Sequence, residues 1–168
     1  MRSRFAIAGH PLHPLLVTIP VGLAVWTLVA DLVYLWGGQN RFWYDLAFWT
    51  GIATIVSALI AALPGFGDYV TVAGRSAARG LATLHMVLNL TVVALFVVAA
   101  LLSANNGALT GNRLNWTVIL HALAVGVLVI SGWLGGEMAY RHHLGMVPDD
   151  AETERLETSR HQMPAGAR

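Results

Sequence analysis

Histidine is the residue type with which this chain could do chemistry, and two histidines open its first apolar segment. His10 and His13 each precede a proline in the run Gly9-His10-Pro11-Leu12-His13-Pro14. Proline fixes its own backbone and disfavours helix for the residue before it, so this run presents two imidazoles on a stiff segment. Imidazole binds haem iron and transition metals and carries protons. The alternative is that Pro14 only begins a helix, with both rings in the wet interface.

A third histidine, His85, is followed four residues later by Asn89. This spacing places both side chains on one face of a helix. His85 lies about one turn inside an apolar segment, where polar side chains normally point toward partners or water. One interpretation is a ligand or proton-handling histidine supported by the amide of Asn89. The other is an interhelical hydrogen bond that only fastens the helices.

Two carboxylates and a histidine pair accompany these residues. Asp68 belongs to Pro64-Gly65-Phe66-Gly67-Asp68-Tyr69, which predicts a loop or a short surface helix, and Glu137 follows Gly135-Gly136. Either carboxylate could orient an imidazole or bind a metal, but a turn residue and an interfacial charge are equally good explanations. His142 and His143 are adjacent, so on a helix only one of them could readily face inward. The sequence does not say which.

These residues are positioned by four apolar segments, each long enough for a helix to cross the bilayer core, which takes about 20 residues. Hydrophobic residues make up 56% of the 168 residues and charged residues only 11%. We predict an all-α integral membrane protein, a four-helix antiparallel bundle over residues 1–147, followed by a polar, disordered tail over residues 148–168. The predicted spans are about 15–36, 43–63, 81–102 and 116–135.

The charges indicate an orientation and exclude one class of partner. Five of the arginines near the helix ends lie on the side of the two termini, and two lie on the opposite side. Because the more positive side faces the cytoplasm, both termini are predicted to be cytoplasmic. The chain has a formal charge of +1 and no lysine, so it offers no basic surface for nucleic acid. It has no cysteine, which leaves His, Asp, Glu, Met and backbone groups to hold any cofactor.

Because the helices alternate in direction, residues far apart in the sequence should converge on the cytoplasmic face. The haem-binding candidates are His13 and His85, with His10 and Asn89 beside them. The alternative set, for a transition metal ion, is His10, His13, His85, Asp68 and Glu137. At the opposite face Asp31 and His121 lie at matching depths. They could pair across the bundle, although Asp31 could also reach the interface.

Four motifs of the chain together resemble domain of unknown function 2231 over about residues 8–147. They are the doubled His-Pro run, Gly65-Phe66-Gly67-Asp68-Tyr69, His85-Met86-Val87-Leu88-Asn89, and Gly132 through Gly145. The resemblance implies a four-helix protein of the bacterial inner membrane, with a general likeness to b-type cytochrome bundles. It carries over as motif positions His10, His13, Asp68, His85 and Asn89. It gives no such support to His121, His142 or His143.

Three functions are compatible with these patterns. The first is a membrane protein that binds haem b or belongs to a redox complex, with a histidine cluster at its cytoplasmic face. The second is a metal-binding or ion-handling membrane protein. The third is a structural or accessory subunit without a cofactor, whose partner does the chemistry. All three place the chain in the lipid bilayer, leave its oligomeric state open, and favour a protein that is not an enzyme on its own.

Overall fold

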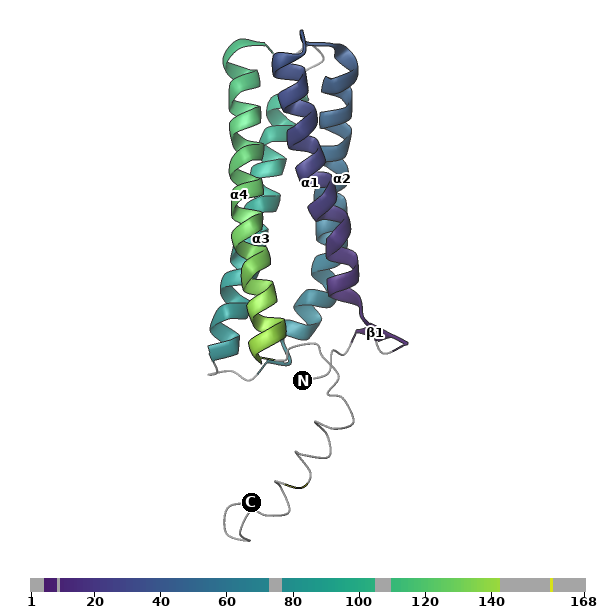
Figure 1. The fold of residues 1–168 in the computed structure, drawn as a ribbon, viewed down its shortest axis with the longest axis vertical. Coiled ribbons are helices and arrows are strands. Elements are labelled where there is room, and N and C mark those ends of the chain that lie inside the picture. Colours follow the sequence, from purple (N-terminus) through teal and green to yellow (C-terminus); the bar gives the residue numbers. More distant parts are fainter. Residues whose placement is uncertain (1–4, 9, 73–76, 105–109, 143–157, 159–168) are drawn as a thin grey trace.

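The computed structural model describes residues 5–8, 10–72, 77–104, 110–142 and 158, and it is a bundle of four long helices. These are α1 (Leu12–Trp36), α2 (Arg41–Tyr69), α3 (Ala77–Ser103) and α4 (Gly111–His142) (Figure 1). All four are long and apolar enough to cross a membrane. The predicted all-α, antiparallel four-helix membrane bundle is therefore confirmed.

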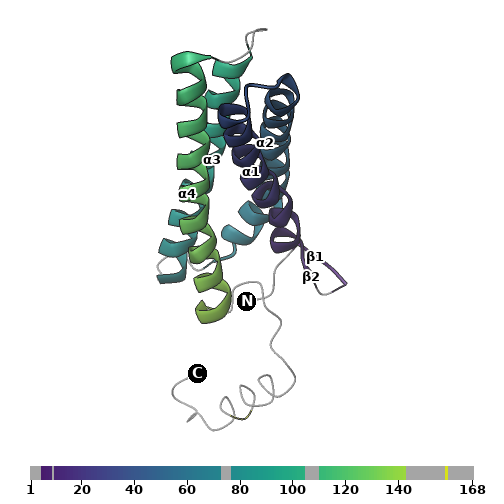
Figure 2. The same cartoon turned by 45° about the horizontal axis from the view of Figure 1, so that its top comes forward.

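The bundle consists of two helical hairpins. Helix α1 packs chiefly on α2, and α3 packs chiefly on α4, while contacts between the hairpins are sparser. We call the end that holds Trp36, Arg41, Ser103 and Gly111 the upper end, and the end that holds Leu12 and His142 the lower end, as oriented in Figure 1. Toward the lower end α1 and α4 draw apart, while the last turns of α2 bend back toward α4 (Figures 1 and 2). The interface between hairpins is therefore the weaker one in the fold.

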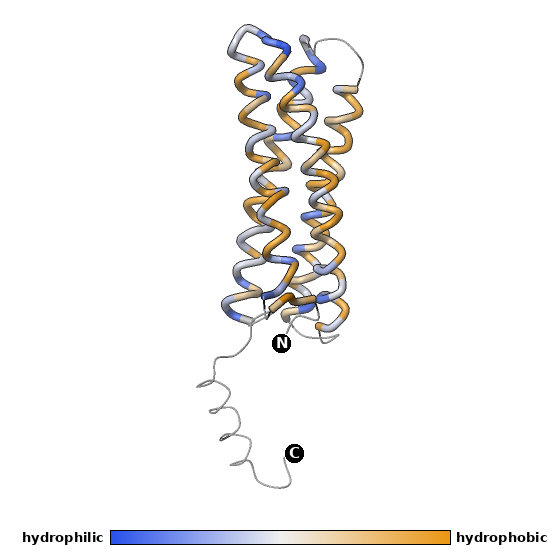
Figure 3. The backbone as a smooth tube through the Cα atoms, turned by 90° about the vertical axis from the view of Figure 1, so that its right-hand side faces the viewer, coloured by the Kyte–Doolittle hydropathy of each residue, from blue (hydrophilic) through white to orange (hydrophobic). Residues whose placement is uncertain are grey.

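The packing of the helices suits a bilayer rather than water. Small side chains such as Ala24, Ala30 and Ala99 fill the centre, which lets the helices approach closely. Large apolar side chains such as Trp49 and Trp133 point outward. Apolar residues cover the middle of the bundle, and hydrophilic ones gather toward its two ends (Figure 3). Exposed apolar surface of this extent requires a cover of lipid.

The helices extend beyond the apolar spans. Helix α2 continues through Pro64 to Tyr69, so the predicted loop or short surface helix at Pro64–Tyr69 is in fact the end of a membrane helix. A proline removes one backbone hydrogen bond, but neighbouring helices can satisfy the freed groups within a membrane bundle. Similarly, α4 includes Glu137. Hydropathy marks only the lipid-facing part of a helix, whereas its backbone hydrogen bonds continue into the interface.

A small β-hairpin precedes α1. Strand β1 (Ala6–Ile7) pairs antiparallel with β2 (His10–Pro11), and the Leu12 amide donates to the carbonyl of Phe5 at 2.8 Å. This hairpin separates the doubled His-Pro run into two environments, because His10 lies on an exposed strand while His13 lies in the first turn of α1. The tail at 148–168 lies outside the described residues apart from Thr158, which is exposed.

Candidate functional site

His13 is held against α2 at the lower end of the bundle. Its Nδ1 lies 2.8 Å from the carbonyl oxygen of Ala61. A carbonyl can only accept, so Nδ1 carries the proton and Nε2 keeps its lone pair. The ring lies over Gly65, where an added Cβ would be 2.7 Å from Nδ1. Tautomer and position of this imidazole are therefore both fixed by α2.

His85 is held against α4 in the same manner. Its Nδ1 lies 2.8 Å from the carbonyl oxygen of Ser131, so it too donates to a backbone carbonyl. Its ring lies beside Gly135, where an added Cβ would be 3.3 Å from Cε1. The Ser131 hydroxyl oxygen lies 3.0 Å from the same Nδ1. The tautomer of His85 is therefore the same as that of His13.

The two hairpins thus repeat one arrangement: a histidine on the first helix, a carbonyl on the second, and a glycine four residues after that carbonyl. A helical side chain covers the turn on its N-terminal side. Glycine at this position therefore leaves the carbonyl of the preceding turn open to a side chain from another helix. Ala61 with Gly65, and Ser131 with Gly135, supply this opening in the two hairpins.

The two imidazoles meet across the interface between the hairpins. The ring centroids of His13 and His85 are 6.3 Å apart, and the ring planes are perpendicular. These rings come from α1 and α3, one from each hairpin. The predicted convergence of His13 and His85 is confirmed.

Asn89 is the third member of this site. Its amide nitrogen lies 2.7 Å from Ser131 Oγ, 2.8 Å from the His85 carbonyl oxygen and 3.1 Å from His85 Nε2. An amide has two N–H bonds to serve these three acceptors. The contact with Nε2 is the longest, so Asn89 can release Nε2 to a ligand while keeping its other two partners.

The other predicted ligands do not join these two imidazoles in a metal cluster. His10 lies on β2 and contacts the carbonyl oxygen of Ala8 at 3.1 Å, and Glu137 forms an ion pair with Arg141 at 2.8 Å. Asp68 lies in the last turn of α2. Within the described residues, no group of three or more His, Asp or Glu side chains is arranged to hold a metal ion. The side chain of His142 and all of His143 lie outside the described part of the chain.

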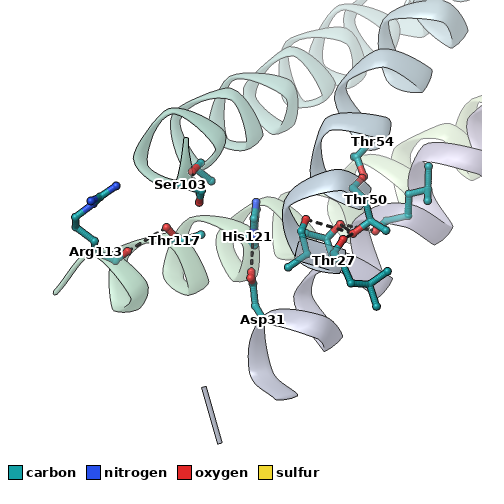
Figure 4. Close-up of polar contacts among 12 residues, drawn as sticks. Thr27, Asp31, Thr50, Thr54, Ser103, Arg113, Thr117 and His121 are labelled. Atoms are coloured by element: carbon teal, nitrogen blue, oxygen red, sulfur yellow. Dashed lines mark hydrogen bonds and ion pairs between the residues drawn. The ribbon is translucent and has the colours of Figure 1, made fainter. Parts of the chain in front are cut away.

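The second polar site lies near the upper end, where Asp31 and His121 pair across the bundle (Figure 4). Nδ1 of His121 lies 2.5 Å from Oδ2 of Asp31, and each side chain is only 6% exposed. The conjectured pair is confirmed, and the alternative that Asp31 reaches the interface is wrong. The imidazole also packs against Phe96, with ring centroids 4.6 Å apart.

Sequence reasoning did not predict the role of Ser131 or of the two glycines. Ser131 is fully buried and contacts both His85 and Asn89. A sequence signal was present, because a small residue precedes a glycine by four positions in both α2 and α4. That spacing is common in ordinary helix packing, so it indicates a histidine contact only when the facing histidine is already known.

The comparisons with known proteins match the chain to a family of membrane proteins. A family described as "Predicted membrane protein (DUF2231)" matches residues 9–148. No curated protein and no solved structure matches the chain.

Proposed function

Since this chain belongs to the DUF2231 family of predicted membrane proteins, we propose that it binds one haem b between its two hairpins, where His13 and His85 would hold it. The observation that carries the proposal is the pair of neighbouring imidazoles, 6.3 Å apart between centroids, with each Nδ1 donating to a backbone carbonyl. Such a bond to the remote nitrogen fixes the tautomer that leaves Nε2 as the ligand.

The spacing of the rings suits one metal centre between them. Metal–imidazole bonds are about 2 Å long, so two imidazoles on opposite sides of one ion have centroids about 6 Å apart. The 6.3 Å between His13 and His85 agrees with this separation. Backbone carbonyls in two different hairpins hold the two rings, so neither ring depends on the other for its position.

The number of ligands favours haem over a bare metal ion. A tetrahedral zinc site takes at least three protein ligands, and the described residues bring only two imidazoles together here. Haem iron needs only axial ligands from the protein. The interface between hairpins is also the sparser one, so a flat group placed there would replace fewer helix contacts than one placed inside either hairpin.

Haem b would supply one-electron redox chemistry at this site. His13 and His85 would both hold the haem, which would then be suited to electron transfer. The backbone carbonyls of Ala61 and Ser131 would hold the imidazoles of His13 and His85 in position. The Asn89 amide would release Nε2 of His85 so that this nitrogen can bind the haem iron. A single redox centre needs an electron donor and an electron acceptor, so we expect a redox partner or a membrane complex. We place the protein in a bacterial inner membrane, with both termini in the cytoplasm.

A cofactor-free accessory subunit is the second candidate function. The observation that favours it is that the same imidazole bonds join α1 to α2 and α3 to α4. In that case the histidines would act only as interhelical hydrogen bonds, which contribute about 0.6 kcal/mol each on average in a membrane protein.

The visible spectrum of the purified protein distinguishes the two candidates. The chain is expressed with ample haem supply, purified in mild detergent, and measured before and after reduction with dithionite. Haem binding predicts a Soret band and sharp reduced α and β bands that are lost in His13→Ala and in His85→Ala. The matched control is His10→Ala, the same change in an exposed histidine nearby in sequence, which should keep the spectrum.

Two results would contradict the proposal. A colourless wild-type protein would exclude haem, and elemental analysis of that sample would then test for a bound metal ion. Full haem content in both His13→Ala and His85→Ala would show that haem binds elsewhere. A colourless, metal-free protein that co-purifies with a stable partner would support the accessory subunit.

A further inference from the structure

The Asp31–His121 pair takes no part in the proposed haem site. It lies near the upper end, whereas His13 and His85 lie near the lower end. On α4, His121 is about 15 Å from Ser131, which holds His85, at 1.5 Å per residue. A buried carboxylate paired with an imidazole is costly in a membrane and is normally retained for a function.

The hydrogen bond fixes which nitrogen of His121 is available. A carboxylate accepts from Nδ1, so Nδ1 keeps its proton and Nε2 is the nitrogen left for exchange. Nε2 points toward Gly51 of α2, where an added Cβ would lie 3.9 Å away. The absent side chain at Gly51 thus leaves space beside Nε2.

A small cavity is lined by His121 and Gly51. Its volume of about 10 Å³ is the space of one water molecule. Its polar lining comes from all four helices: Asp31, Tyr44, Ser103, Thr117 and His121. Figure 4 shows Asp31, Ser103 and Thr117 around His121. The rest of the lining is apolar, from Ala47, Phe48, Gly51, Phe96 and Ala100. A water in a cavity of this size needs two to four polar partners, which the five polar side chains can offer.

The titratable groups that line the cavity are few. Asp31 comes from α1, Tyr44 from α2 and His121 from α4, while α3 contributes Phe96, Ala100 and Ser103, none of which titrates. The Tyr44 hydroxyl donates to the Ser103 carbonyl oxygen at 2.6 Å and is thereby occupied. His121 and Asp31 are left as the groups that can exchange a proton with water in the cavity.

We propose that the Asp31–His121 pair is a proton-binding site served by a water in this cavity, with His121 Nε2 as the acceptor. A hydronium ion gives its proton to Nε2 and becomes water, while Nδ1–H remains bonded to Asp31. The pair then changes from a net charge of −1 to zero. The upper end is the nearer end of the bundle for this site, since Asp31 lies only about 8 Å from the end of α1 at Trp36.

Nuclear magnetic resonance of the full chain in lipid nanodiscs, with histidine labelled with nitrogen-15, tests this site. The His121 signals are assigned by their loss in His121→Gln, and spectra are recorded between about pH 5 and pH 8. We expect the Nε2 signal to move from its neutral to its protonated position on acidification, while Nδ1 stays protonated. The signals of the exposed His10 provide an internal reference in the same spectra.

A His121 Nε2 signal that stays at its neutral position over this pH range would overturn the proposal, and this result needs no variant. Gly51→Ala then tests the cavity, because the added methyl would make ordinary contacts of 3.6 to 3.9 Å beside Nε2 without a clash. We expect Gly51→Ala to keep Nδ1 protonated but to lose the titration of Nε2. Unchanged titration in Gly51→Ala would show that the cavity is not the route.

The experiment separates this site from the haem site. His13→Ala and His85→Ala should leave the titration of His121 unchanged, whether or not haem is bound. Loss of the titration in both variants would overturn the independence of the two sites.

Discussion

Replacing Gly65 by alanine tests whether the position of His13 depends on the missing side chain. An added Cβ would lie 2.7 Å from Nδ1 and 2.8 Å from Cε1 of His13, closer than such atoms can approach. The ring cannot move away without weakening its 2.8 Å bond to the Ala61 carbonyl oxygen. Gly65→Ala should therefore separate the start of α1 from α2.

The expected magnitude combines three terms. Overpacking costs about 1–3 kcal/mol and a lost hydrogen bond about 0.5–1.5 kcal/mol, while alanine is better than glycine in a helix by about 1 kcal/mol. We expect Gly65→Ala to lower the free energy of unfolding by about 2 kcal/mol, within a range of about 0.5–3.5 kcal/mol. Haem content should fall with it, because His13 would be displaced.

Two other glycines provide matched controls. Gly135→Ala places Cβ 3.3 Å from His85 Cε1, which a shift of a few tenths of an ångström relieves, so its effect should stay within about 1 kcal/mol. Gly126→Ala has no neighbour within 4 Å and should be neutral or slightly stabilising. Unfolding in mixed micelles with increasing sodium dodecyl sulfate, followed by tryptophan fluorescence, measures all three. The reasoning fails if Gly65→Ala is as stable as Gly126→Ala.

Three further substitutions, with Asp45→Ala as a control, probe the remaining polar contacts by the same unfolding assay. Asp31→Ala removes one partner of a buried pair and should cost about 3–5 kcal/mol, whereas Asp45→Ala, in an exposed pair, should cost less than about 1 kcal/mol; equal effects would contradict the burial argument. Tyr44→Phe loses a buried 2.6 Å bond to Ser103 and should cost about 1 kcal/mol, and no loss would show that this bond contributes nothing. Ser131→Ala deprives Asn89 of its hydroxyl acceptor but keeps the backbone carbonyl that holds His85, so it should cost about 1 kcal/mol and retain haem.

The sequence determined the architecture because the signal for a membrane helix is local. Each run of about 20 apolar residues identifies a span without reference to the others. Their alternating directions then placed His13 and His85 at one end of the bundle and Asp31 and His121 near the other. The sequence predicted the ends of the helices less well than their centres. A helix that continues past its lipid-facing part, as α2 does through Pro64, leaves no hydropathy signal there.

Only the tertiary structure decided which polar groups touch. Depth along a helix follows from counting residues, but the direction of a side chain around the helix axis depends on how all four helices pack. The rotation of the helices places His13 beside the carbonyl of Ala61 and His85 beside the carbonyl of Ser131. His10 lies outside the helices, on an exposed strand. The physical reason is that these contacts join helices far apart in the sequence, so no local pattern encodes them.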